Sequence, residues 1–349
     1  MTDKPDGNQS QKSQKTRLFV SSLAHFLSKD WCRASFLVLT AVIIHVPALS
    51  GELIWDDIYL AHDNPFIKSP LLILEAFRHY LFLDSYSAHY RPVQNLSLIF
   101  DYFFWNDNTY GFHLTNVLLH GICGILLYFL LRRLLTSFFT HRLTSTTLST
   151  TAFLVALIWT VHPVHSAAVD YISGRADSLA FLFAATGWLL FLCAEDSLSV
   201  LPRIFFYGLA SGAALLALCS RETACIWLAI FLVYTLFFER HLRAQKKVIL
   251  LAACVALIGL YGGLRQLPDR RPGPGPGPEW SPPVRAVLML RALGDYGRLL
   301  VFPANLHMER TVFNPENYRN SVTWERSAGT EYLSIIGLTF GALLALGCT

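Results

Sequence analysis

Long apolar runs separated by short polar breaks dominate the chain. A helix of about 20 apolar residues can cross the hydrocarbon core of a membrane. Eight runs approach this length, at about 34–50, 112–135, 151–169, 177–194, 203–220, 222–239, 247–264 and 331–349. A further run at about 285–302 contains Arg291, Asp295 and Arg298, so we expect an interfacial helix there. The pattern predicts an all-α polytopic membrane helical bundle.

The longest polar break before residue 265 covers 51–111 and is not a plain loop. Its segments 71–83 and 93–105 are amphipathic and predict two short helices lying on the membrane. The first external loop is therefore expected to be helical. A second non-spanning region, 265–330, contains the Pro- and Gly-rich stretch 272–278, which predicts a mobile linker.

Basic residues in the breaks predict the orientation of the chain. Lys and Arg collect in the cytoplasmic loops of membrane proteins. Here they collect in residues 1–33, a polar N-terminal segment, and in the breaks at 132–142 and 240–247. We therefore place these three segments in the cytoplasm, and the 51–111 loop and the 265–330 region outside. Residues 34–349 form the membrane domain.

The composition supports a membrane protein and excludes a nucleic-acid partner. Of 349 residues, 53% are hydrophobic and only 15% are charged, whereas soluble proteins carry about a quarter. The net charge of +4 is small and scattered between apolar runs. We expect a multi-pass membrane protein. The general look of the motifs described below favours a bacterial cytoplasmic membrane, with an endoplasmic reticulum membrane as the alternative in a eukaryote.

The first candidate site is the acidic pair Asp56-Asp57, which follows Trp55 just beyond the first apolar run. Adjacent carboxylates at a membrane boundary are costly to desolvate, and like charge raises the pKa of one of them. A carboxylate with a raised pKa suits a general base that takes a proton from a hydroxyl. The alternative is a solvated acidic turn, and the pair alone favours this alternative.

A second candidate site lies where one apolar run ends outside and the next begins. His162 and His165 share a helix face and could bind a metal, although structural contacts at a helix junction are the favoured interpretation. Arg175 is a planar cation suited to phosphate. A local ion pair with Asp177 is the alternative.

Two further arginines stand beside apolar runs. Arg221 and Glu222 form a charged break that is either an external turn with an ion pair or a contact to a lipid phosphate. Arg298 either extends harmlessly to the interface or holds an anionic headgroup. Under the predicted topology, these arginines and the acidic pair share one membrane face. The combination fits a hydroxyl that attacks a group linked to a lipid phosphate, with the phosphate leaving.

Other polar candidates are Arg91 and a helix face formed by His113, Asn116 and His120. Polar residues within a span often join helices to one another. We expect this structural role for Asn116 in particular.

The motifs in this order resemble the GT-C glycosyltransferase superfamily. Within it, the chain is most similar to protein O-mannosyltransferases that carry transmembrane segments followed by tetratricopeptide repeats, and to their bacterial relatives. The resemblance covers about residues 30–310. The motifs that carry it are Ile54-Trp55-Asp56-Asp57, Asn64-Pro65, Tyr90-Arg91-Pro92, Gly111 to His120, His162-Pro163-Val164-His165, Gly174-Arg175-Ala176-Asp177, Arg221-Glu222 and Arg298 to Pro303.

The resemblance implies a function and a set of roles. It implies an inverting transfer of a hexose from a polyprenyl-phosphate-linked donor to a hydroxyl of a protein or glycan acceptor on the non-cytoplasmic face. Asp56 or Asp57 would be the catalytic base, with Asp56 favoured. The donor phosphate would be held by Arg175, Arg221 and Arg298. Supporting residues would be Arg91, His113, His162, His165, Asp177 and Glu222. O-mannosyltransferases generally need no metal, so we expect no metal and no other cofactor.

The chain departs from the family because it has no tetratricopeptide repeats and fewer helices than the superfamily. Its last apolar run has no polar flank, so we expect a truncated chain. Two rival hypotheses remain. A transporter or flippase for polyprenyl-phosphate lipids would need the arginines but no acidic base, and the nearly uncharged runs 177–194 and 203–220 argue against its polar path. A non-catalytic membrane scaffold subunit would tolerate loss of the aspartates.

Overall fold

The computed structural model describes residues 29–82, 89–139, 141–239, 242–268, 280–306 and 332–347. Within these residues the regular structure is helical, without strands. Five helices are long and apolar enough to cross a membrane, or six if one bent pair is a single span. The predicted all-α polytopic bundle is therefore confirmed. The linker predicted at 272–278 and most of the predicted N-terminal segment lie outside the described residues.

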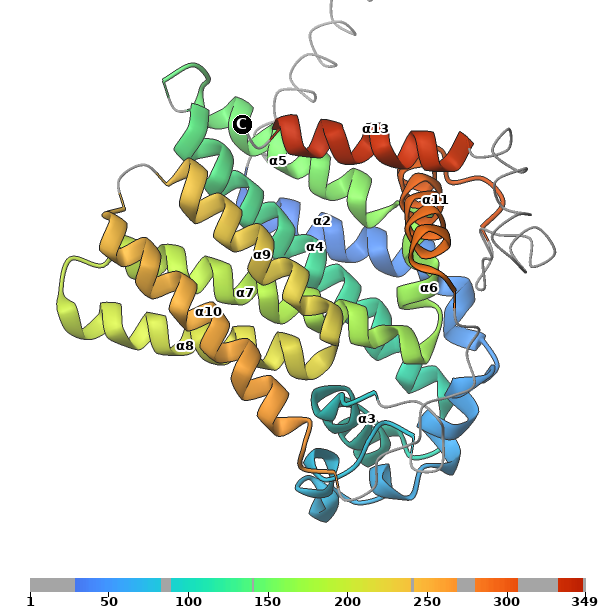
Figure 1. Cartoon of the computed structure of the whole chain (residues 1–349). Coiled ribbons are helices and arrows are strands. Elements are labelled where there is room, and N and C mark those ends of the chain that lie inside the picture. The colour runs from blue at the N-terminus through green and yellow to red at the C-terminus, as the bar shows by residue number, and fades with distance from the viewer. Residues whose placement is uncertain are drawn as a thin grey trace, which may run out of the picture.

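The bundle is built from helices that run back and forth between its two ends (Figure 1). The apolar segments Glu222–Phe238 and Tyr332–Leu343 are shorter than the five spanning candidates. The span predicted over 222–239 is therefore shorter than expected, and the end of the one predicted over 331–349 lies outside the described residues. The helices are α2 (Asp30–His45), α4 (Thr109–Phe139), α5 (Ser145–Thr160), α7 (Arg175–Asp196), α8 (Val200–Ser220), α9 (Cys225–Val233), α10 (Ala244–Leu264), α11 (Pro282–Val301) and α13 (Tyr332–Gly347).

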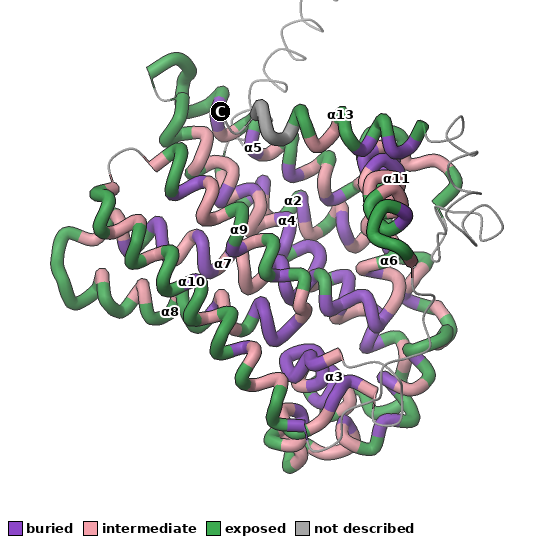
Figure 2. Tube along the Cα trace, in the orientation of Figure 1, coloured by how far each residue is buried: buried purple, intermediate pink, exposed green. Residues whose placement is uncertain are grey.

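Small residues let the bundle helices approach closely. A Cβ on Gly187 of α7 would lie 3.1 Å from the Ala210 carbonyl oxygen of α8. One on Gly124 of α4 would lie 2.7 Å from the Thr160 hydroxyl of α5. Close backbone approach through small residues is typical of helix packing in membranes. Buried residues are concentrated on α4 and α7, while much of α8 and α10 is exposed (Figure 2).

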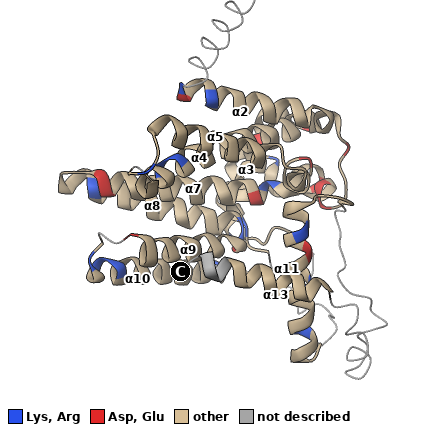
Figure 3. Ribbon diagram, turned by 90° about the horizontal axis from the view of Figure 1, so that it is seen from above, with Lys and Arg blue, Asp and Glu red and all other residues tan. Residues whose placement is uncertain are grey.

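The exposed surface of the bundle is apolar. Leu201, Ile204 and Phe205 of α8 and Val248 and Val255 of α10 are all more than half exposed. Long stretches of these helices carry no charge, as Figure 3 shows. An apolar surface of this extent is suited to lipid rather than water.

The predicted span over 151–169 is broken. Helix α5 ends at Thr160, and η6 (Pro163–His165) and α6 (Ser166–Val169) continue at an angle of 50°. Pro163 disfavours helical backbone at the residue before it, and His162 is extended there with ψ of 122°. The proline therefore turns the chain before the next helix.

The 51–111 segment, which was predicted to be a helical external loop, is helical but not in the way that was predicted. The helix expected over 93–105 is present as α3 (Pro92–Trp105). No helix covers 71–83 in its described part: instead, single turns form at Pro70–Leu72 and Glu75–Phe77. Ala76 and Leu81 are buried in a cluster with Leu98 of α3 and Ile172. The apolar residues of this segment thus pack in a small protein core at the end of the bundle, where Figure 1 shows α3.

Candidate functional site

The neighbouring residues Asp56 and Asp57 lie in different environments. Trp55, just before them, has φ of 50°, a left-handed conformation that is strained for a bulky residue. Asp57 is fully buried, and its carboxylate accepts hydrogen bonds from the backbone N–H groups of Ile172 (2.9 Å) and Ser173 (2.7 Å). Asp56 is exposed, and its carboxylate has no hydrogen-bonding or ion-pair partner within the described part of the chain.

Burial raises the pKa of Asp57 to about 6. The two backbone hydrogen bonds and the charge of Arg175 oppose this rise, while Asp56 adds to it. The effect of desolvation on the pKa of Asp57 is larger than these opposing effects, because a buried carboxylate loses the hydration of its charge. A carboxyl with this pKa is near the ideal for a base at neutral pH, but both of its oxygens already hold the start of η7 (Ile172–Gly174).

Arg175, at the start of α7, is fully buried among protein groups. It forms an ion pair with Asp101 of α3 at 2.6 Å, and its Nε donates to the Asn116 side chain at 2.8 Å. It also donates to the Phe112 carbonyl at 2.9 Å. This geometry favours a structural role over the predicted phosphate contact, which stays untested. The ion-pair partner of Arg175 is thus Asp101 and not Asp177, the local partner considered in the sequence.

Asp101 and Asn116 connect the 51–111 segment to the bundle. Asn116 donates to the carbonyls of Val169 and Tyr171, so it joins helices as expected. Asp101 was missed by the sequence analysis. The signal was present, because a lone carboxylate in the apolar segment 93–105 needs a buried partner.

A group of charged residues, which we term the Glu222 cluster, lies at the break between α8 and α9. It joins α3, α7 and the turn η8 (Glu222–Ala224). The Arg91 guanidinium donates to both oxygens of Glu222, at 3.1 and 2.8 Å. Such a two-pronged pair is stronger and more directional than a single contact. His89, which the sequence analysis did not select, lies 3.2 Å from the same carboxylate.

Arg221 completes the Glu222 cluster by an ion pair with Asp177 of α7. Its side chain is 29% exposed, unlike that of Arg175, and its buried Nε has no hydrogen-bond partner among the described residues. Four residues from three separate motifs of the sequence therefore meet in one cluster. They are Arg91, Asp177, Arg221 and Glu222. Arg221 retains donor capacity for an anion.

The N-terminus of α7 links the acidic pair to the Glu222 cluster. Asp57 binds Ser173, and Arg221 binds Asp177, four residues later. At the rise of an α-helix these two positions are roughly 6 Å apart along the axis. The exposed Asp56 is further tied to this region, because its backbone N–H donates to the Tyr171 hydroxyl at 3.2 Å. The chain thus brings a free carboxylate and a partly free guanidinium to the same end of one helix.

The predicted histidines lie close to this region without forming a metal group. His162 caps η6 by accepting the Val164 N–H, and its other nitrogen donates to the Leu300 carbonyl at 3.2 Å. His165 packs on Trp159, with ring centroids 4.3 Å apart. His113 is buried in α4. Across the described ranges, no three His, Cys, Asp or Glu side chains form a group that could hold a metal ion.

Arg298 lies on α11, which is joined to the site region through the contact between Leu300 and His162. Its guanidinium donates to Asp295 of the same helix, at 3.1 and 2.8 Å. The side chain is 29% exposed. Arg298 therefore stays a candidate for the donor phosphate, but it lies outside the Glu222 cluster.

Comparison with known proteins finds several curated relatives. Protein O-mannosyl-transferase TMTC1 of Mus musculus is 30% identical over 220 residues, which cover 60% of this chain and 22% of that protein. Protein O-mannosyl-transferase F38B6.6 of Caenorhabditis elegans is 27% identical over 159 residues, 44% of this chain and 22% of that protein. The TMTC1 protein of Homo sapiens is 28% identical over 222 residues, 58% of this chain and 23% of that protein.

The match is thus partial. The chain spans less than a quarter of the length of these three relatives in the matched part. No family model matches the chain, and no solved structure matches it. The predicted resemblance to protein O-mannosyltransferases is nevertheless confirmed, because these relatives carry that name.

Proposed function

We propose that this chain forms the membrane part of a glycosyltransferase. It would transfer a sugar from a polyprenyl-phosphate-linked donor to an acceptor hydroxyl on the non-cytoplasmic face, with protein O-mannosylation as the reaction. The observation that carries the proposal is the exposed, unpartnered carboxylate of Asp56 at the end of the molecule that also presents Arg221. The names of the curated relatives support the reaction class.

In the proposed reaction, Asp56 takes the proton of the acceptor hydroxyl. The acceptor oxygen then forms a bond to the anomeric carbon while the bond from that carbon to the phosphate oxygen breaks. Inversion follows because the nucleophile attacks opposite the leaving phosphate. Arg221 stabilises the negative charge that develops on the phosphate, as fixed cations do for a leaving group.

Asp57 serves in this proposal as a positioning residue. Its two backbone hydrogen bonds fix the turn that carries Asp56 against the start of α7. The pair of Arg91 and Glu222 similarly fixes the break between α8 and α9, next to Arg221. No step is assigned to a metal. The host membrane, bacterial cytoplasmic or endoplasmic reticulum, stays a prediction.

The proposal is tested by sugar release from a mannosyl polyprenyl phosphate with the full chain purified in detergent. We expect Asp56→Asn to lower turnover by about 100-fold or more, the usual contribution of a general base, while donor affinity is retained. Asp63→Asn is the matched control, because Asp63 is also an exposed acid of the same loop. Arg221→Gln should weaken donor binding about tenfold.

Three results would overturn the proposal. Wild-type turnover by Asp56→Asn would exclude this base. Donor binding without turnover in the wild type would favour the transporter or scaffold hypotheses. Equal losses in Asp56→Asn and Asp63→Asn would indicate a general effect of charge on the loop.

A further inference from the structure

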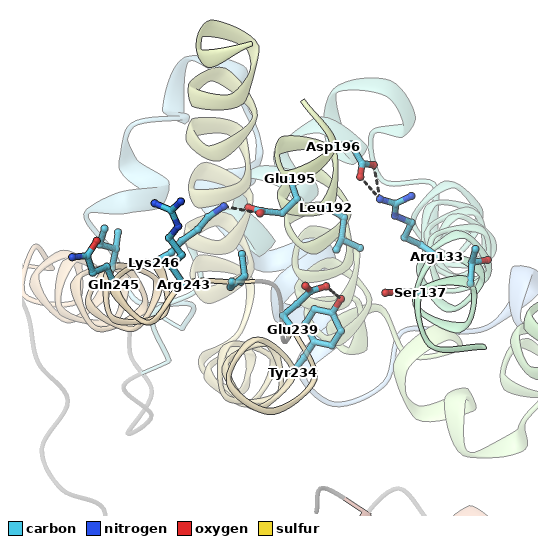
Figure 4. Close-up of a pocket in the computed structure, with 13 residues that line it drawn as sticks. Arg133, Ser137, Leu192, Glu195, Asp196, Tyr234, Glu239, Arg243, Gln245 and Lys246 are labelled. Atoms are coloured by element: carbon cyan, nitrogen blue, oxygen red, sulfur yellow. Dashed lines mark hydrogen bonds and ion pairs between the residues drawn. The ribbon is translucent and has the colours of Figure 1, made fainter. Parts of the chain in front are cut away.

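A second polar site lies at the opposite end of the bundle. It is a cavity of about 650 Å³ between the ends of α4 and α7, the π-helical turn η9 (Tyr234–Phe238) and the start of α10 (Figure 4). Its charged lining residues are Arg133, Glu195, Asp196, Glu239, Arg243 and Lys246. The ends of α7 that carry Asp177 and Glu195 are roughly 27 Å apart by helical rise, about the thickness of a membrane core.

The six charges of this cavity are not all paired. Arg133 binds Asp196, and Lys246 binds Glu195 at 2.6 Å (Figure 4). Glu239 accepts only the Tyr234 hydroxyl, at 2.6 Å, and has no cationic partner within the described ranges. The exposed guanidinium of Arg243 has no acidic partner there either. Among the charged residues that the structure describes around this cavity, one carboxylate and one guanidinium therefore remain for a ligand with both charges.

An apolar groove lies beside the polar cavity. It has a volume of about 390 Å³ and lies between α7, α8, α9 and α10. Lys246 and Ile249 line both spaces, so the groove and the cavity are adjacent. Most of the groove is formed by alanine and aromatic side chains, including Trp188 and Trp227. A polar cavity beside an apolar groove matches a molecule with a charged head and a hydrocarbon chain.

Trp188 supplies an independent observation. Its side chain is 7% exposed and lines the groove, and its buried indole Nε1 has no hydrogen-bond acceptor among the described residues. Buried donors are normally paired. An ester carbonyl is an acceptor that a glycerophospholipid offers next to its hydrocarbon chains.

We propose that this composite site binds one glycerophospholipid with a zwitterionic, amine-bearing headgroup. Arg243 holds the phosphodiester, Glu239 holds the ammonium group, and an acyl chain occupies the groove beside Trp188. The balance of charge selects a zwitterion, because the paired residues cancel and the two remaining groups have opposite signs. This site lies at the end of the bundle predicted to be cytoplasmic, away from Asp56, and does not depend on the proposed transfer reaction.

Native mass spectrometry of the full chain in detergent, titrated with phosphatidylethanolamine or phosphatidylglycerol, tests this proposal. We expect one high-affinity phosphatidylethanolamine per chain, bound at least fivefold more tightly than phosphatidylglycerol. Glu239→Gln should abolish this preference, and Arg243→Gln should weaken both lipids about tenfold. Arg142→Gln is the matched control, because Arg142 is exposed near the same end but does not line the cavity.

The groove is tested separately by two substitutions on α10. Ala253 lines the groove and Ala252 does not, although both are exposed. Ala253→Phe should weaken phosphatidylethanolamine at least fivefold, and Ala252→Phe should leave its affinity unchanged. Equal affinity of the wild type and both charge variants would overturn the site. Displacement of the lipid by millimolar inorganic phosphate would show a phosphate site rather than a lipid site.

Discussion

At the scale of single residues, the site depends on which charged groups are buried with partners and which stay free. Asp57 and Arg175 are both fully buried, and each is surrounded by protein hydrogen bonds. Asp56 and Arg221 lie nearby but keep exposed or unpaired polar atoms. The first pair therefore acts on the shape of the site, and the second pair is available for chemistry.

Arg175→Met is expected to destabilise the protein strongly. It leaves Asp101 buried without its partner, and breaking a buried ion pair costs about 3–5 kcal/mol. Thermal unfolding in detergent would measure the loss. Adding Asp101→Asn to Arg175→Met should recover part of it, since no charge then remains unpaired. A double variant whose loss equals the sum of the two single losses would contradict the coupling.

Asp57 should make stability depend on pH. Its folded pKa of about 6 lies above the unfolded value near 4. The folded state therefore binds the Asp57 proton more tightly than the unfolded state does. The stability gained from this proton is fully present below about pH 4 and is lost as the pH rises through about 6. The full change is about 3 kcal/mol, because the pKa differs by about 2 units between the folded and unfolded states.

The Asp57 prediction is measured by melting temperatures in detergent at pH 4.5 and 7. The stability of the wild type relative to Asp57→Asn should fall between these pH values. Asp63→Asn, at an exposed acid, serves as the control. A difference between wild type and Asp57→Asn that is constant with pH would contradict the raised pKa.

At the scale of elements, small residues allow helices to pack closely, and a proline ends a helix. Gly124 and Gly187 bring α4 and α7 against their neighbours. Pro163 ends the segment that the hydropathy pattern presented as continuous over 151–169. The pattern detects apolar runs but not the angle at which two of them meet, so the bend was not predictable from periodicity alone.

Gly187→Leu should destabilise the packing of α7 against α8. The added side chain would start 3.1 Å from the Ala210 carbonyl oxygen, and overpacking costs about 1–3 kcal/mol. Gly259→Leu on α10 is the matched control, because nothing lies within 4 Å of a Cβ there. Only the first variant should lower the melting temperature in detergent. Equal melting temperatures for the two variants would show that α7 and α8 are less closely packed.

At the scale of the whole molecule, polar sites occupy both ends of an apolar bundle. The Glu222 cluster and Asp56 lie at one end, and the cavity around Glu239 and Arg243 lies at the other. The α7 helix connects the two ends (Figure 1). The proposed transfer reaction and the proposed lipid site would therefore lie at opposite leaflets of the membrane.

Cysteine labelling would measure this sidedness. Glu52→Cys, near the acidic pair, should react with an impermeant maleimide added outside cells or to sealed right-side-out vesicles. Gln245→Cys, beside the polar cavity, should react only after permeabilisation. Both parent residues are exposed. The unsubstituted chain controls for its own cysteines, and labelling of both variants from one side would contradict the predicted topology.

The sequence by itself determined the class of protein, most of the apolar helices and the chemical types at the site. Apolar runs must become helices in lipid, because backbone groups there have no water to bind. The order of the acidic and arginine motifs was also enough to identify the resemblance. These properties are local or compositional, so they can be seen along the chain.

Only the tertiary structure decided which groups are free. Asp56 and Asp57 are adjacent and identical in type, and the strained turn at Trp55 with the amides of residues 172–173 separates them. In the sequence Arg175 and Arg221 looked equivalent. The structure distinguishes them, because Arg175 forms a buried ion pair with Asp101. The partners are far apart in sequence, and desolvation depends on what surrounds a group in space. Burial and pairing across the bundle therefore lay beyond any local pattern.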